Sequence, residues 1–544
     1  MAWANKGFAH RPMAMGTRGA VTSAHPLATL AGMRILQSGG NAVDAAVATA
    51  AALNVAEPYM SGIGGSGYML IYSANERTLR VLDYVGPSSR NADLASFASE
   101  SEKNHGPKSP IVPSAATGWL TAHAASGSLD LKTIFTPAIE YATTGVPLTV
   151  KNAWFYEAMF KAGNLTDQTK SVFMPHGRAP SAGEVIRQPR LARTFERLVD
   201  GGVESFCRGE LAREIVESIR VQGGLIDAED LASYEPVWKD PLSRAYRGYT
   251  IACPPPTCSG WQYLKAFGLL QGFDIGAMEH NSVDHIHTLA ETFKLAVADR
   301  IAYTTNPCLD LEALLSDDHA AVRRGMIDPD RAAFVEGERY QGRRPDDAVP
   351  PSDPAYALKE CTTHFDVVDA EGNAVAVTQS LGDGFGSGVM AGETGLMLNN
   401  FGYWFDFDAD SPNAIGPNRN IEMCMAPAAI LRDDALFGVI GTPGSFGILQ
   451  TTPQMISNLV DHEYSIQAAI EAPRIKATSG RTLQIETRVS SDVRDGLAQR
   501  GHDLEHIGDW SHLVGGGQGI MIDPDTGSYA AGADPRRDGY ALAW

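Results

Sequence analysis

The residue types that could do chemistry begin with a threonine pair, Cys361-Thr362-Thr363-His364, at the start of an apolar segment. A threonine hydroxyl is a weak nucleophile unless a base lies beside it. One solution makes the threonine the first residue of a chain, so that its own α-amine accepts the proton. Cleavage of the chain just before Thr362 would create such a residue. Threonine pairs at strand starts are also ordinary β-formers, so the pair alone leaves both interpretations open.

A second hydroxyl is expected beside Thr362. Residues 362–369 and 374–381 predict the two strands of a β-hairpin. In that hairpin Ser380 returns opposite Thr362, or within a residue or two of it, where its hydroxyl could orient the nucleophile. His364 is less suitable, because it lies two positions along the same strand, about 6 to 7 Å away, too far for a direct hydrogen bond.

A glycine turn could complete this site. Residues 436–440 predict a strand that runs into Gly441-Thr442-Pro443-Gly444-Ser445, and a helix is expected to follow from about Ile448. A glycine turn at a helix N-terminus presents backbone N–H groups, which can stabilise the oxyanion that develops when an acyl group is attacked.

Other motif-like patterns are assigned to structure rather than to chemistry. Residues 62–67 have the spacing of a dinucleotide-binding glycine motif, but a helix ending at Pro58 precedes them and a strand follows, the reverse of the order that binding needs. His285 and His287 lie in a predicted helix, where residues two apart point away from each other and cannot chelate one metal ion. The acidic run 406–410 lacks the glycine and glutamate of a calcium loop. We therefore expect no metal ion and no cofactor.

The composition excludes some classes of partner. The 544 residues include 44 Lys and Arg against 64 Asp and Glu, a net charge of −20, which disfavours nucleic acid as a partner. The longest apolar stretch, residues 42–56, is shorter than the ~18 residues that a bilayer span needs, and the N-terminus carries no recognisable secretion signal. A cytoplasmic protein without membrane association is expected.

The sequence also predicts the elements that must position the candidate site. Residues 42–56 and 283–303 favour helices, and residues 68–72 and 79–84 favour strands. A polar, proline-rich run over residues 338–360 predicts an exposed connector, which is the clearest boundary in the chain and ends just before the threonine pair.

Together these residues resemble the γ-glutamyltranspeptidase family, which belongs to the N-terminal nucleophile hydrolases. The resemblance runs through nearly the whole chain, on both sides of the threonine pair. The matching segments are 39–47, 62–65, 137–139, 230–234, 254–260, 299–300, 362–364, 372–378, 385–388, 398–400 and 441–444.

The resemblance implies an α+β fold, a four-layer αββα sandwich, made as a precursor that cuts itself before Thr362. A large subunit of residues 1–361 and a small subunit of residues 362–544 would then remain associated. In this scheme Thr362 first attacks the carbonyl of Cys361, and hydrolysis of the resulting ester frees its α-amine. The mature threonine would then attack a small-molecule amide and form an acyl-enzyme, which water or an acceptor amine resolves.

The resemblance also implies roles for three further residues. Ser380 matches the hydroxyl residue that steadies the nucleophile. The N–H groups of Gly444 and Ser445 match the oxyanion hole, where Ser445 replaces the usual second glycine but still offers an N–H.

The expected substrate pocket departs from the family. The family grips the α-carboxylate of a γ-glutamyl group with an arginine and a pair of serines, and its α-amino group with an acid and amides. Each charge-assisted hydrogen bond is worth roughly 1.5 to 3 kcal/mol, so their loss should weaken the binding of free γ-glutamyl groups. The matching positions in this chain hold Val85, Gly382, Phe401, Trp404, Met423 and Cys424.

We therefore expect a self-processing amidohydrolase with a more apolar or aromatic acyl pocket, whose acyl group is not free γ-glutamyl and which favours hydrolysis over transfer. A true γ-glutamyltransferase or glutathione hydrolase remains an alternative. It requires shifted loops to bring other charged side chains to the α-carboxylate and α-amino group of the substrate, and these contacts are called the γ-glutamyl clamp below. An uncleaved binding relative without catalysis is a second alternative, and homo-oligomer formation is left open. The side chains that could restore the clamp are Arg90, Arg419, Asp406 and Asp408.

Overall fold

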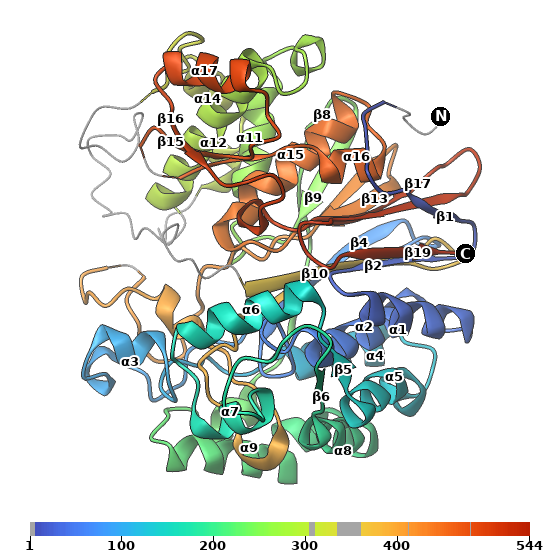
Figure 1. The fold of residues 1–544 in the computed structure, drawn as a ribbon, viewed down its shortest axis with the longest axis vertical. Coiled ribbons are helices and arrows are strands. Elements are labelled where there is room, and N and C mark those ends of the chain that lie inside the picture. Colours follow the sequence, from blue (N-terminus) through green and yellow to red (C-terminus); the bar gives the residue numbers. More distant parts are fainter. Residues whose placement is uncertain (1–5, 304–309, 334–360, 412, 479) are drawn as a thin grey trace.

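The computed structural model arranges the chain in four layers (Figure 1). Two seven-stranded antiparallel sheets pack face to face, and helices cover the outer face of each. The predicted αββα sandwich is therefore confirmed. The predicted connector at residues 338–360 lies outside the described residues. The structure describes residues 6–303, 310–333, 361–411, 413–478 and 480–544.

The first sheet carries the threonine pair at the beginning of β10 (Cys361–Val368). From Phe365 onward, β10 pairs with β2 on one side and β11 on the other. Before Phe365, β10 pairs only with β11 among the described residues. The backbone of Thr362 on the side away from β11 therefore has no partner strand there and can bind other groups. The order across this sheet is β19 (Tyr540–Ala543), β2 (Ala20–Ser23), β10, β11 (Ala374–Gly382), β3 (Ser66–Ser73), β4 (Thr78–Tyr84) and β7 (Val237–Lys239).

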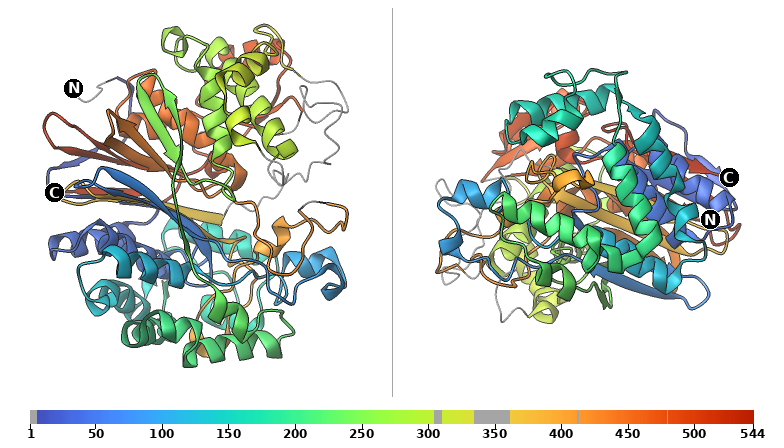
Figure 2. Two further views of the ribbon diagram at one scale, coloured as in Figure 1. Left: turned by 180° about the vertical axis from the view of Figure 1, so that it is seen from behind. Right: turned by 90° about the horizontal axis from the view of Figure 1, so that it is seen from below.

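The second sheet faces the first through β13 and β17, which contact β10 and β11 across the sandwich. Both sheets mix strands from before and after residue 362, as the colours in Figure 2 show. Two subunits divided at that point would therefore share both sheets. The order across the second sheet is β1 (Ala14–Gly16), β18 (Tyr529–Ala533), β17 (Gln518–Ile522), β13 (Ala435–Gly441), β12 (Ala428–Arg432), β9 (Tyr249–Cys253) and β8 (Leu242–Tyr246).

Each helical layer contacts one sheet. Against the first sheet and outside it lie α1 (Pro26–Gln37), α2 (Ala42–Ala56), α4 (Ala115–Ser126), α5 (Leu131–Thr144), α8 (Pro189–Cys207) and α9 (Glu210–Val221). On the second sheet lie α11 (Trp261–Leu270), α15 (Ile448–Val460) and α16 (Ile466–Glu471), with α12 (Val283–Tyr303), α14 (Asp317–Arg324) and α17 (Ser491–Gln499) farther out. The smaller elements are α3 (Glu100–Asn104), α6 (Val150–Lys161), α7 (Asp167–Phe173), α10 (Ala228–Ser233), α13 (Leu311–Leu314), β5 (Val146–Pro147), β6 (Val185–Ile186), β14 (Ile475–Ala477), β15 (Thr482–Ile485) and β16 (Asp503–His506).

The elements predicted from the sequence are found where they were expected. The helices at 42–56 and 283–303 form as α2 and α12, and the predicted hairpin forms as β10 and β11. The glycines at 62–67 make a turn that leads into β3. Among the described residues, no helix combines the length and apolar character needed to cross a bilayer.

Helix α2 supports the first sheet from behind, and all of its residues are buried. Its alanine-rich sequence favours a helix and allows close packing against α1 and β10. Asn41 and Asp44 form a capping box at its first turn. The buried Asp44 carboxylate accepts hydrogen bonds from the N–H groups of Asn41 at 3.0 Å, Ser128 at 3.0 Å and Leu129 at 3.2 Å.

Replacement of Asp44 should therefore destabilise the whole fold. Asp44→Ala leaves three partly buried N–H groups without this acceptor. Each lost hydrogen bond costs roughly 0.5 to 1.5 kcal/mol, so we expect a loss of about 1.5 to 4.5 kcal/mol in the free energy of unfolding. Urea unfolding followed by circular dichroism would measure it. Asp44→Asn keeps one acceptor oxygen and should lose less; an alanine variant as stable as the asparagine variant would contradict this account.

Candidate active site

The β10–β11 hairpin places Thr362 directly opposite Ser380, as predicted. The Ser380 hydroxyl donates a hydrogen bond to the Cys361 carbonyl oxygen and accepts one from the Gly382 N–H at 2.8 Å. Cys361 is 2% exposed and Thr362 is 4% exposed. The peptide bond between them is therefore buried, and a neighbouring hydroxyl polarises its carbonyl group.

The two threonines face opposite layers, because side chains alternate along a strand. Thr363 Oγ1 donates a hydrogen bond of 3.5 Å to Glu57, the C-cap residue that follows α2 in the helical layer. Thr362 points to the other face, toward the second sheet and on the same side as Ser380. The structure thus places the two adjacent hydroxyls on opposite faces of the sheet, with the predicted nucleophile Thr362 on the face of Ser380.

His364 shares the face of Thr362, but both of its ring nitrogens are engaged elsewhere. Nδ1 lies 2.8 Å from Thr378 Oγ1, and Nε2 lies 3.1 Å from Asp366 Oδ1. A side chain on Gly441 of the second sheet would collide with the imidazole ring. These contacts agree with the expectation that His364 is not the base for Thr362.

Arg537 is a neighbour of Thr362 that the sequence did not reveal. Its Nη1 donates a hydrogen bond of 3.0 Å to the Thr362 carbonyl oxygen, and the side chain is 2% exposed. A buried cation is thereby placed beside the backbone of the candidate nucleophile. The one signal that could have pointed to it is the Arg536-Arg537 pair, placed directly before the last strand.

A buried ionic network fixes the segment that carries Arg537. Arg536 Nε donates to Glu486 at 2.8 Å, and Asp534 pairs with Arg474 at 2.7 Å. Burial would raise the pKa of Asp534, but Arg536 and Arg474 outweigh it and hold that pKa at about 2. Because each charge has a partner, the network can stay ionised inside the protein and position the arginine that follows it.

The predicted strand, glycine turn and helix are all present between Ala435 and Val460. Strand β13 ends at Gly441, and Gly444 and Ser445 turn the chain with φ angles of 135° and 52° before α15 begins. The Thr442 hydroxyl accepts a hydrogen bond from Gly516 N–H at 2.9 Å. Gly516 packs closely against Arg537, so the loop that holds the turn contacts the arginine that binds the Thr362 carbonyl.

Aromatic side chains lie directly beside this turn. The ring of Trp404 stacks on that of Phe446, with centroids 5.1 Å apart, and Phe446 follows Ser445 in the chain. Phe401 contacts Trp404 edge-on at 5.7 Å. The Arg300 guanidinium lies 4.0 Å from the centre of the Phe446 ring. Two of the predicted substrate residues, Phe401 and Trp404, therefore form one cluster at the predicted oxyanion turn.

The other predicted substrate positions fall into three places. Met423 and Cys424 are fully buried, and burial raises the pKa of the Cys424 thiol, a shift that Arg300 opposes. Gly382 packs against Asn400, so that any side chain there would collide with the Asn400 amide. Val85 lines a separate cavity of about 390 Å³, whose lining residues do not include Thr362 or Ser380.

The side chains that could restore a γ-glutamyl clamp have other partners. Arg90 lies 3.7 Å from Asp230, and Arg419 donates to the Ala414 carbonyl at 2.8 Å. Asp406 accepts a hydrogen bond from Ser411, and Asp408 accepts one from the Asp410 N–H. Each of these contacts already uses part of the hydrogen-bonding capacity of the side chain within the protein.

Glu57, which Thr363 contacts, is an unusual carboxyl group. It is 2% exposed, and burial raises its pKa to about 8, while Arg537 opposes that shift. The sequence signal for it is a single charged residue, next to Pro58, in an otherwise uncharged stretch. Glu57 and Arg537 reach the threonine pair from opposite ends of the chain.

The two histidines of α12 have different partners, as their spacing predicted. His285 Nε2 lies 3.3 Å from His462, whereas His287 Nδ1 lies 2.9 Å from His502 Nε2. Burial lowers the pKa of His502 to about 3 and also lowers that of His287, which favours the neutral form of both imidazoles. Glu291, one turn after His287, completes a group that the spacing of the two histidines did not reveal.

Comparison with known proteins gives matches along almost the whole chain. The family model described as Gamma-glutamyltranspeptidase matches residues 28–544. The Acylase ACY 1 proenzyme of Pseudomonas sp. strain V22 is 33% identical over 551 residues, covering 97% of this chain and 94% of the relative. The Glutathione hydrolase-like YwrD proenzyme of Bacillus subtilis strain 168 is 32% identical, covering 97% of this chain and 99% of the relative.

A solved structure matches equally well. The cephalosporin acylase from Bacillus halodurans superposes with a TM-score of 0.88 at 33% identity, covering 99% of this chain and 98% of that chain. The similarity therefore extends over both sheets and both helical layers, including the β10–β11 hairpin.

Glu57 should make stability depend on pH. Its folded-state pKa of about 8 exceeds the ordinary 4.5, so the folded protein binds a proton that the unfolded chain releases between these values. The free energy of unfolding should therefore fall as pH rises from 4.5 to 8, by at most about 1.4 kcal/mol per pH unit from this group. Urea unfolding at several pH values should show a shallower fall for Glu57→Gln. The exposed Glu76→Gln is the control; equal slopes in all three proteins would contradict the assignment.

Proposed function

The chain belongs to the γ-glutamyltranspeptidase family, and from that premise we propose a precursor that cuts itself before Thr362 and then hydrolyses a small amide through a Thr362 acyl-enzyme. Two relatives are named proenzymes, one of them an acylase, which supports a self-processing amidohydrolase. The observation that carries the assignment to Thr362 is the hydrogen bond from Ser380 to the Cys361 carbonyl, directly opposite that threonine.

The proposed self-cleavage is an acyl shift followed by hydrolysis. Thr362 Oγ attacks the carbonyl carbon of Cys361, the peptide C–N bond breaks, and an ester joins the two residues. Water then hydrolyses the ester, which leaves a carboxylate on Cys361 and a free amine on Thr362. Ser380 supports the first step, because a hydroxyl that donates to the carbonyl oxygen stabilises the negative charge developing there.

The freed amine is proposed as the base for turnover. It accepts the Thr362 hydroxyl proton as Oγ attacks the substrate carbonyl, and it returns the proton to the departing amine. Arg537 supports this role, because a guanidinium held at the Thr362 carbonyl disfavours a second positive charge on the adjacent amine. The N–H groups of Gly444 and Ser445 are the proposed donors to the substrate oxyanion.

The proposed acyl group is apolar or aromatic. The stacked rings of Trp404 and Phe446 beside the oxyanion turn offer a surface for such a group. Arg300, which contacts these rings, already donates to Glu422 at 2.8 Å and to Gln262 at 2.8 Å, so its charge is compensated within the protein. A free γ-glutamyl group would bring a carboxylate and an ammonium that this surface cannot pair.

Removal of the Thr362 hydroxyl should stop processing. We expect purified Thr362→Ala to remain one chain of 58.2 kDa by mass spectrometry, while wild-type protein yields a fragment whose N-terminal sequence is Thr-Thr-His-Phe. Thr362→Ser is the matched control, because it keeps a hydroxyl and should still cleave. Cleavage of the alanine variant would assign the cut to an outside protease, and an intact wild-type chain after long incubation would favour the non-catalytic alternative.

The mature enzyme should prefer apolar acyl amides. We expect kcat/KM for phenylacetyl-p-nitroanilide to exceed that for γ-glutamyl-p-nitroanilide by at least about tenfold, because each unmade charge-assisted hydrogen bond costs roughly 1.5 to 3 kcal/mol. Trp404→Ala should lower kcat/KM for the aromatic substrate alone. Product analysis with and without glycylglycine would measure hydrolysis against transfer.

Efficient turnover of the γ-glutamyl substrate, with acyl amides ignored, would instead favour a true γ-glutamyltransferase or glutathione hydrolase. That result would overturn the proposed acyl group but not the proposed nucleophile, since both substrates would acylate Thr362.

A further inference from the structure

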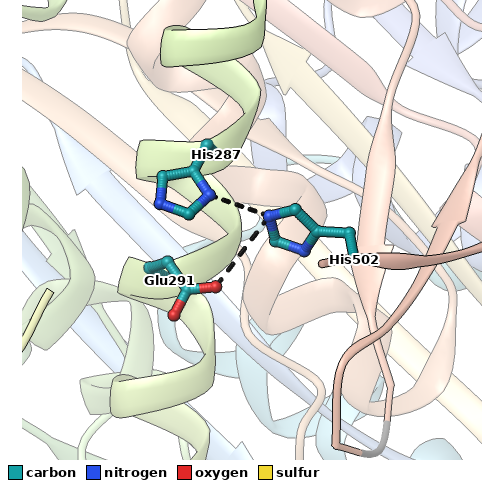
Figure 3. Close-up of side chains that lie close together, drawn as sticks. All are labelled: His287, Glu291 and His502. Carbon is teal, nitrogen blue, oxygen red and sulfur yellow. Dashed lines mark hydrogen bonds and ion pairs between the residues drawn. The ribbon is translucent and has the colours of Figure 1, made fainter. Parts of the chain in front are cut away.

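Three buried ligand-type side chains converge far from the threonine pair in sequence. His287 and Glu291 lie one turn apart on α12, and His502 lies between α17 and β16 (Figure 3). Their exposed fractions are 1%, 2% and 3%. His502 Nε2 lies 2.9 Å from His287 Nδ1 and 4.0 Å from Glu291 Oε1, so one atom of each residue faces a common point.

The surrounding contacts aim these atoms at one another. His287 Nε2 lies 2.8 Å from the Asp328 carbonyl oxygen, which requires that this nitrogen carry the proton and that Nδ1 present its lone pair. Glu291 Oε2 accepts a hydrogen bond from Ala333 N–H at 3.1 Å, which leaves Oε1 to face the histidines. A carbonyl behind a ligating imidazole is the arrangement that orients histidines in metal sites.

We propose that His287 Nδ1, His502 Nε2 and Glu291 Oε1 bind one divalent transition-metal ion of the zinc class, with water completing the coordination. In the metal-bound form His502 carries its proton on Nδ1, so that Nε2 presents a lone pair to the ion. Two imidazoles and one carboxylate suit zinc rather than calcium or magnesium, which require oxygen ligands. Tetrahedral bonds of about 2.0 to 2.1 Å place ligand atoms about 3.3 Å apart. The present separations of 2.9 and 4.0 Å bracket that value, so small shifts of the side chains suffice.

Lys294 is the competitor for this ion. Without metal, its ammonium group donates to Glu291 Oε1 at 2.7 Å and supplies the positive charge that the buried carboxylate needs. A metal ion at the same oxygen competes with that ammonium group for the negative charge of the carboxylate, and the two cations repel each other at close range. The affinity for metal is therefore set by the exchange of one cation for another at Glu291.

The ligands come from both sides of residue 362. His287 and Glu291 belong to the predicted large subunit and His502 to the predicted small one, so a bound ion would fasten the two chains together. This consequence rests on the proposed function, but metal binding does not. The backbone reinforces the same junction, since Ala332 N–H donates to the Arg500 carbonyl at 2.7 Å.

Metal binding by the full-length protein tests the proposal. After dialysis against a chelator, wild-type protein should bind about one Co²⁺ per chain with the intense visible absorption of a tetrahedral site, and Zn²⁺ should displace it. His502→Ala and Glu291→Gln should each lose this stoichiometric binding. His285→Ala is the matched control, because it removes another buried histidine of α12 that contacts His462, and it should bind Co²⁺ as the wild type does.

Two further variants make the outcome decisive even if His502→Ala folds poorly. Lys294→Gln keeps a hydrogen-bond donor but removes the competing charge, so it should bind Zn²⁺ at least about tenfold more tightly. Uncleaved Thr362→Ala should bind Zn²⁺ as tightly as the wild type, which separates this proposal from the proposed cleavage. Absence of stoichiometric binding by wild-type protein, or an unchanged affinity in Lys294→Gln, would overturn the site.

Discussion

The register of β10 against β11 is the constraint on which the candidate site depends. A slip of one residue would exchange the faces of the two threonines, turning Thr363 toward the second sheet and Thr362 toward Glu57. Buried contacts hold the register in place, notably the hydrogen bonds of His364 to Thr378 across the pair and to Asp366 along the strand. The polar core of this hairpin therefore keeps Thr362, and not Thr363, on the face that carries Ser380.

Electrostatics links the hairpin to the rest of the molecule. Arg537 binds the Thr362 carbonyl from a segment anchored by the ion pairs of Asp534 and Arg536, and it packs beside the loop that fixes the glycine turn. The groups around Thr362 thus come from the first sheet, the second sheet and the end of α2. A buried charge network is costly unless its charges are paired, and here Arg474 and Arg536 pair with Asp534 and Glu486.

Local sequence patterns predicted several elements of the fold and of the candidate site. The bounds of α2, the pairing of Thr362 with Ser380, and the strand, turn and helix around Gly444 all follow from periodicity and from glycine signals. The sequence could not supply Arg537, which lies 175 positions from Thr362, or His502, which joins a group on α12 through tertiary packing. Such long-range contacts produce no recognisable spacing of residues in a single sequence.

The roles of Ser380, Gly444, Ser445 and the substrate positions remain predictions, and Val85 lies in a separate cavity.

The burial of the bond between Cys361 and Thr362 has a kinetic meaning. A peptide bond at the start of an inner strand, with both flanking residues almost wholly covered, cannot enter the cleft of a second enzyme molecule. If it is cut in the folded protein, each molecule must cut its own. Maturation would then be first order, with a half-life unaffected by dilution, and a molecule that matures cannot hasten the maturation of its neighbours.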